Sequence, residues 1–208
     1  MVADIMHENG WFCIGNGAKK LYYMNLEQKQ NLLNLQFTVN RPNDVWVSDV
    51  TYFKYNNTVY YICVILDLFA RKVIGYRISL FNSTQLTKGT FITAYKKRQP
   101  QDLMFLSDQG TNYTSATFRL CLIGLNVKQS FSNPSNPFNN SVMESFFKSM
   151  KTEKLYRTDF RSEREFRIVV KEYIEFYNEK RPHSVLRYRT PNRCEEDYIR
   201  KQAALHNI

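Results

Sequence analysis

Three carboxylates in the middle of the chain have the residue type and the surroundings for metal-dependent chemistry. Residues 41–150 carry twelve Lys and Arg side chains but only six Asp and Glu, and Asp49, Asp108 and Glu144 are among the six. If the three converge, each pair repels by about 4 kcal/mol at roughly 4 Å for an effective dielectric constant of about 20, so a cation must lie between them. Carboxylate oxygens without His or Cys suit Mg²⁺, and two such ions about 4 Å apart catalyse in-line displacement at phosphorus. The pattern therefore predicts phosphodiester chemistry.

Each of these carboxylates also has an ordinary structural explanation. Asp49 lies inside a predicted strand, where an edge position that water reaches would explain the charge. Asp108 lies in the turn-like stretch SDQGTNY, and Asp shortly before Gly is common in turns. The run from Ser141 to Glu144 matches the capping box, in which Ser and Glu satisfy amides at a helix start. Taken singly, the residues leave both explanations open, and only their convergence favours catalysis.

The elements around these residues predict a sheet that brings two of the carboxylates together. The predicted strands are 45–53, 58–66, 72–79, 103–106 and 126–130, and the predicted helices are 83–97, 115–123, 141–155 and 163–179. This order predicts an α/β fold with a mixed five-stranded sheet, three antiparallel strands followed by two parallel ones, and helices on both faces. Asp49 in the first strand and Asp108 after the fourth would then be neighbours.

The helix predicted over 141–155 would place Glu144 at the same end of the sheet. At 100° per residue, Glu144, Lys148 and Lys151 form a line along this helix, beside an apolar stripe. We therefore predict that the two lysines bind phosphate. Further candidates for positioning the metal or a DNA strand end are Gln109, Tyr113, Asn136 and Asn140.

Other charged residues have simpler interpretations. Asp67 precedes Leu-Phe-Ala-Arg71, which predicts an ion pair between Asp67 and Arg71 across a turn. The basic residues 96–98 end a predicted helix, where cations interact favourably with the helix dipole. For His183 we predict a role in packing.

The composition limits the class of partner and the compartment. A formal net charge of +10 and a pI near 9.4 favour a polyanion such as DNA or RNA, and less often an anionic membrane. No stretch approaches the roughly 18 consecutive apolar residues that a membrane span needs, and the start lacks the basic-then-apolar pattern of an export signal. The four cysteines are widely spaced and not grouped with His, which predicts free thiols. We therefore expect a cytoplasmic protein without a membrane partner.

Five sequence blocks in order also resemble a known family. They read WVSDVTYF, VILDLFARKVIGY, LSDQGTNYTS, NPFNNSVMESFFKSMKTE and YNEKRPH, and 35 residues separate Asp108 from Glu144. The blocks are similar to the integrase-like core of insertion-sequence transposases, in particular to the second-reading-frame product of the insertion sequence three family. The resemblance covers about residues 30–195.

This resemblance implies a ribonuclease-H-like fold and a DNA strand transferase. It makes Asp49, Asp108 and Glu144 the Asp-Asp-Glu metal triad, with two Mg²⁺ ions in the presence of substrate and Mn²⁺ as a substitute. Lys151, seven positions after Glu144, matches the basic residue that guides DNA in the family. The implied partners are double-stranded DNA, as element ends and as target, and further copies of the chain on that DNA, in the bacterial cytoplasm at the nucleoid.

The sequence departs from the family pattern at several positions. Leu106 replaces a frequent His and Asn139 a frequent acidic residue, which would reduce activity without abolishing metal binding. We also expect the DNA-binding module of the first reading frame to be missing. We therefore expect a truncated helical segment over 1–40, an integrase-like core over 41–160 and a helical extension over 161–208. Two alternatives stay open: a catalytically inactive truncated transposase that only binds DNA, and a general ribonuclease that cuts RNA in a hybrid.

Overall fold

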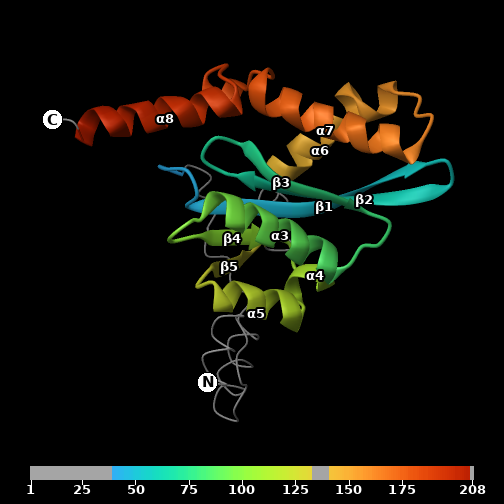
Figure 1. Ribbon diagram of the computed structural model, residues 1–208, viewed down its shortest axis with the longest axis horizontal. Helices are drawn as coiled ribbons and strands as arrows, with labels where there is room; N and C mark the ends of the chain where they lie inside the picture. Colours follow the sequence, from blue (N-terminus) through green and yellow to red (C-terminus); the bar gives the residue numbers. More distant parts are fainter. Residues whose placement is uncertain (1–38, 133–140, 207–208) are drawn as a thin grey trace, which may run out of the picture.

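A computed structural model describes residues 39–132 and 141–206 of the chain, which form one mixed sheet with helices on both faces (Figure 1). The strands are β1 (Val45–Tyr55), β2 (Thr58–Asp67), β3 (Lys72–Ser79), β4 (Met104–Ser107) and β5 (Lys128–Phe131). They lie in the order β3-β2-β1-β4-β5. β1 pairs antiparallel with β2, and β2 with β3, whereas β4 pairs in parallel with β1 and with β5. The predicted fold class is confirmed.

The first hairpin forms because its turn residues accept an unusual backbone conformation. Asn56 and Asn57 have φ angles of 45° and 59°, in the left-handed region that Asn tolerates better than most residues. Two such residues match the twist of the flanking strands, so β1 and β2 pair without a longer loop. The ten-residue pairing runs from Tyr55 opposite Thr58 to Trp46 opposite Asp67. This long ladder makes β1 a rigid support for any side chain along it.

Six helices and two short 3-10 turns cover the sheet. The α-helices are α3 (Thr84–Arg98), α4 (Thr111–Thr114), α5 (Ala116–Gly124), α6 (Ser141–Glu153), α7 (Glu163–Glu179) and α8 (Pro191–His206) in the described part of the chain. The 3-10 turns span Leu155–Arg157 and Ser184–Leu186. The helix predicted over 141–155 therefore ends two residues early and is followed by a 3-10 turn. α4 is an addition that the sequence pattern did not predict.

The central strand separates two hydrophobic cores. Val45 and Val47 of β1 face a core that α6 and α7 complete, whereas Trp46 between them faces a core shared with α3 and α5. The second core is aromatic: the Phe91 ring lies edge-on to Phe105, with centroids 5.1 Å apart. Alternation along β1 therefore decides which residues point towards α6, and the odd-numbered ones do so.

A buried ion network attaches α8 to the sheet. The Arg98 guanidinium bonds both Asp67, at 3.3 Å, and Glu195 of α8, and Lys72 bonds Glu195 as well. The prediction of an Asp67–Arg71 pair is wrong, because Arg98 at the end of α3 reaches Asp67 first. The predicted position of residues 96–98 in the last turn of a helix is confirmed.

The YNEKRPH block connects the end of α7 to the sheet and to α6. The Asn178 side-chain amide accepts from Val73 N–H and donates to Val73 C=O, both at 2.9 Å, along the edge of β3. Arg181 donates to both carboxylate oxygens of Glu153 in α6. His183 packs edge-on against the Tyr177 ring, with centroids 4.6 Å apart, so its predicted packing role is confirmed.

Three further expectations concern the N-terminal helices, the cysteines and membrane-spanning helices. The helices expected within residues 1–38 belong to a part of the chain that the structure does not describe. Cys63, Cys121 and Cys194 are free thiols, as predicted. None of the helices in the described ranges is long and apolar enough to cross a membrane.

Candidate active site

Asp49 and Asp108 lie side by side because of the register between β1 and β4. In this parallel pair Val45 lies opposite Met104, and Val47 opposite Leu106. Asp49 follows Val47 by two residues, and Asp108 follows Leu106 by two residues. Parallel strands run in the same direction, so both carboxylates extend from the same end of this pair. The predicted neighbourhood of the two aspartates therefore follows directly from the observed register.

Both aspartates also belong to the face of the sheet that α6 covers. Val47 and Leu106 contribute to the core beneath α6 and α7. Side chains alternate between faces, so Asp49 and Asp108 continue on that same face. Asp49 is half-buried, in the central strand but beyond the last residue that pairs with β4. The alternative of an edge strand does not hold for Asp49, although water still reaches it there.

The turn after β4 holds the Asp108 carboxylate in place. Gly110 N–H donates to Asp108 Oδ1 at 3.0 Å, which is the side-chain-to-backbone bond of an Asx turn. A Cβ atom at position 110 would lie 2.9 Å from the same oxygen, so a larger residue there would require the carboxylate to shift. The turn interpretation of Asp108 is therefore confirmed, and it orients the carboxylate instead of competing with a functional role.

Glu144 occupies the first turn of α6, on its exposed side. The helix packs on β1 through its apolar face, including Met143 and Phe147. Within the described ranges, no three His, Cys, Asp or Glu side chains lie close enough together to hold a metal ion. The register thus places Asp49 and Asp108 at neighbouring strand ends, and the three predicted ligands do not come together as a metal-binding group among the described residues.

Lys151 is the basic side chain that reaches the aspartates from α6. Burial lowers the pKa of Lys151, and the nearby Asp49 carboxylate opposes that shift. The Lys151 ammonium also lies 5.3 Å from the centroid of the Tyr52 ring. Lys148, one turn earlier, is exposed. Sequence reasoning missed Tyr52, because a tyrosine in a predicted strand is ordinary; its position three residues after Asp49 was the available signal.

Tyr113 does not face this site. Its side chain is 2% exposed, and its hydroxyl hydrogen bonds with Ser48 Oγ at 2.8 Å on the opposite face of β1. We therefore assign Tyr113 to packing in place of the predicted DNA contact, because no surface of the ring is left for DNA. Burial in the same cluster raises the pKa of the Cys63 thiol to about 11. Ser48, Tyr113 and Cys63 thus pack together on the face of β1 opposite to α6.

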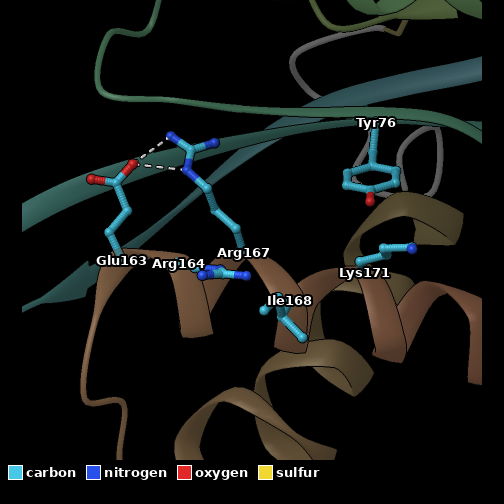
Figure 2. A pocket seen from close by; sticks show the side chains of 6 residues that line it. All are labelled: Tyr76, Glu163, Arg164, Arg167, Ile168 and Lys171. Atoms are coloured by element: carbon cyan, nitrogen blue, oxygen red, sulfur yellow. Dashed lines mark hydrogen bonds and ion pairs between the residues drawn. The ribbon is translucent and has the colours of Figure 1, made fainter.

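The remaining predicted contacts have mixed outcomes. Gln109 is half-buried next to Asp108, where its side chain can reach the surface. Asn136 and Asn140 lie outside the described residues. A separate open groove lies between β3 and α7, where Tyr76 faces Lys171 and an Arg167–Glu163 ion pair closes one end (Figure 2). None of the predicted site residues lines this groove.

Comparison with protein families and with curated relatives shows which family the chain resembles. Two models described as an integrase core domain match residues 39–137 and 125–191. The transposase of insertion sequence element IS904 from Lactococcus lactis is 34% identical over 200 residues, which cover 94% of this chain and 79% of that protein. The putative transposase InsK of IS150 from Escherichia coli is 36% identical over 162 residues, which cover 77% of this chain. The chain spans 57% of the length of InsK.

Solved structures agree on the fold. A simian T-cell lymphotropic virus intasome in complex with the PP2A regulatory subunit B56 gamma contains a chain that superimposes with a TM-score of 0.65 at 19% identity, covering 76% of this chain and 56% of that one. The HTLV-2 integrase catalytic core domain in complex with magnesium superimposes with a TM-score of 0.60 at 18% identity. This match covers 74% of this chain and 97% of that one.

The fold and the matching domain models define an integrase-core protein with a ribonuclease-H-like sheet. Within that class, the chain belongs to the insertion-sequence transposases of the IS3 family, which include those of IS904, IS150 and IS3.

Proposed function

We propose that this chain is the catalytic core of a DNA transposase, which hydrolyses a phosphodiester at an element end and joins the freed 3′-hydroxyl to target DNA. The observation that carries the proposal is the β1–β4 register, which sets Asp49 beside Asp108 at one end of the sheet. The identity to transposases along most of the chain supports the same reaction class. Double-stranded DNA and further copies of the chain are the proposed partners, in the bacterial cytoplasm.

The residues of this site fit a hard divalent cation. Asp49 and Asp108 offer only carboxylate oxygens, which are the ligands that Mg²⁺ and Mn²⁺ accept. The glycine at position 110 keeps the Asp108 carboxylate fixed in its turn. The HTLV-2 integrase core of similar fold was solved in complex with magnesium. A pair of such ions, when bound, would supply the charge that activates an attacking hydroxyl and stabilises the departing oxygen.

In this proposal Glu144 completes the site by approaching the aspartates. Its helix already packs on β1 through apolar side chains, and the acidic side chain stands at the exposed edge of that contact. A movement of the first turn of α6 would bring this carboxylate to the pair. Lys151 contributes positive charge next to Asp49, where it can bind a phosphate adjacent to the reacting one.

The domain division belongs to the same proposal. We infer that residues 41–160 form the catalytic core and that residues 161–208 extend it. Packing supports this, since Phe166 and Val170 of α7 lie in the same hydrophobic core as Val47. The C-terminal helices would then stabilise the core and would not form an independent unit.

The test is cleavage of a labelled DNA duplex copied from the sequences that flank the gene. Wild-type protein should nick it with Mg²⁺ or Mn²⁺, and Asp49→Asn, Asp108→Asn and Glu144→Gln should each reduce nicking to background. Asp102→Asn is the matched control, because Asp102 is an exposed acid before the other end of β4. Retained nicking by Asp108→Asn would refute the proposal.

A second candidate is a DNA-binding protein without catalysis. It is favoured by the exposed position of Glu144, which forms no metal-binding group with the two aspartates among the described residues. Such a protein would bind duplex DNA with a strong dependence on salt, because Lys and Arg contacts release counterions from the phosphates. It would show no nicking with either metal, and its three carboxylate variants would behave like wild type.

A further inference from the structure

Tyr52 is an exposed aromatic side chain beside Lys151, on the strand that carries Asp49. It stands three residues after Asp49 in β1 and keeps 63% of its surface exposed. Its neighbour Phe53 points into the core, where its ring stacks on Phe166 with centroids 5.6 Å apart. The backbone beneath Tyr52 is therefore fixed by packing, while its own ring stays on the surface.

The Tyr52 ring is also linked to the charge of the site. The Lys151 ammonium lies 5.3 Å from the ring centroid, within the range of a cation–π contact. Lys151 belongs to α6, and α6 packs on β1, the strand that carries both Tyr52 and Asp49. Lys151 thus joins the Tyr52 ring to the helix that borders the predicted site.

We propose that Tyr52 stacks against a DNA base of a nucleotide next to the phosphodiester held at Asp49 and Asp108. The inference rests on the proposed function for the position of that phosphodiester. A strand-borne tyrosine has only two side-chain torsions to immobilise, so it gives a rigid platform at low entropic cost. Every base has an aromatic face, so this contact adds affinity and register without selecting a sequence.

The surroundings favour a nucleotide over a protein partner on this ring. Lys54, two residues further along β1, is exposed, and so is Lys148 on α6. Together with Lys151 they add positive charge to β1 and α6, the two elements that meet at this ring, which suits the phosphates on either side of a stacked base. A base on Tyr52 would therefore place its own phosphate near Lys151 and the next one near the aspartates.

The experiment uses a branched DNA duplex with 2-aminopurine at the first unpaired position, mixed with the full chain in the absence of divalent ions. Stacking quenches the fluorescence of this base analogue. Wild type and Tyr52→Phe should quench it, whereas Tyr52→Leu should not, and Tyr52→Leu should bind the DNA about 10-fold more weakly, as expected for the loss of one base–aromatic stack. Tyr188→Leu removes another exposed aromatic ring, before α8, and should match wild type.

A second measurement changes the DNA in place of the protein. An abasic nucleotide at the unpaired position should weaken wild-type binding by the same factor of about 10 and should not weaken Tyr52→Leu further. The proposal is overturned if the abasic DNA binds wild type as tightly as the intact DNA. It is equally overturned if Tyr52→Leu still quenches, or if Tyr188→Leu loses as much as Tyr52→Leu.

These results separate the stacking inference from the proposed reaction. Quenching that depends on Tyr52, without any nicking on addition of Mg²⁺ or Mn²⁺, would support the stacking role and reject catalysis. Nicking that depends on Asp108, with the same quenching in Tyr52→Leu and wild type, would support catalysis and reject the stacking role.

Discussion

Two groups of carboxylates in this molecule have opposite arrangements. Asp67 and Glu195 are buried and meet Arg98 and Lys72 directly, so the protein neutralises them with its own cations. Asp108 meets a backbone amide and stands beside Asp49 at the open end of the β1–β4 pair. In the proposed function, the difference separates a structural ion network from a site that would receive a cation from outside. Charge alone does not distinguish the two groups; their partners do.

The largest expected effect is on stability, at the buried network. Arg98→Met should lower the free energy of unfolding by about 3–5 kcal/mol, because it leaves two buried carboxylates without their shared partner. Denaturant unfolding measures this. Lys97→Met is the control, since Lys97 is exposed in the same helical turn and should change stability little. Equal losses in both variants would contradict the structural role of the network.

A second prediction concerns metal binding at the aspartate pair. Mg²⁺ at about 100 times its dissociation constant should stabilise the protein by about 2.7 kcal/mol, because binding to the folded state alone shifts unfolding by mass action. Asp49→Asn should lose this gain, whereas Asp67→Asn should keep it. Thermal unfolding with and without Mg²⁺ checks the contrast. If Asp49→Asn responded to Mg²⁺ as wild type does, the aspartate pair would not be the metal site.

The buried network also predicts a pH dependence. Burial raises the pKa of Asp67 from its ordinary value of 3.8 to about 6, so between these pH values the folded state holds a proton that the unfolded state has lost. The free energy of unfolding should therefore fall as pH rises from about 4 to about 6, by about 1–3 kcal/mol from this residue. Asp67→Asn should flatten this part of the profile. Chemical denaturation at a series of pH values measures it, and an unchanged slope in the variant would reject the assignment.

The smallest expected effect belongs to Lys151. Lys151→Gln should weaken DNA binding uniformly across sequences and reduce the slope of log affinity against log salt by about 1, as for the loss of one phosphate contact. Its stability should change little, because the side chain is only partly buried. Lys201→Gln, exposed near the end of α8, is the matched control. A salt slope that Lys151→Gln leaves unchanged would mean that Lys151 does not contact phosphate.

Much of the fold could be predicted because it depends on local patterns. The range 72–79 matches β3, and 163–179 matches α7, since both have a clear period and clear ends. β5 begins two residues later than expected, because Asn126 takes a left-handed conformation with φ of 53°. The helix over 141–155 was predicted too long because its final residues wind into a 3-10 turn.

The partners of individual side chains were harder to predict, because they depend on distant segments. Asp67 pairs with Arg98, 31 positions away, where the sequence pattern offered a nearer arginine. Tyr113 bonds Ser48, 65 positions away, and only the packed sheet shows that this contact points away from the site. The neighbourhood of Asp49 and Asp108 was predictable, because strand order and direction were sufficient for it. The distance of Glu144 from them depends on helix placement, which no local pattern encodes.

The amide of Asn178 has a consequence for how copies of this protein can meet. By bonding both backbone groups of Val73, it takes the place that a strand from another molecule would need at that position of the outermost strand. Arg167 covers the carbonyl of Ile78 near the other end of the same strand. The sheet of one copy therefore cannot simply continue into the next along this border.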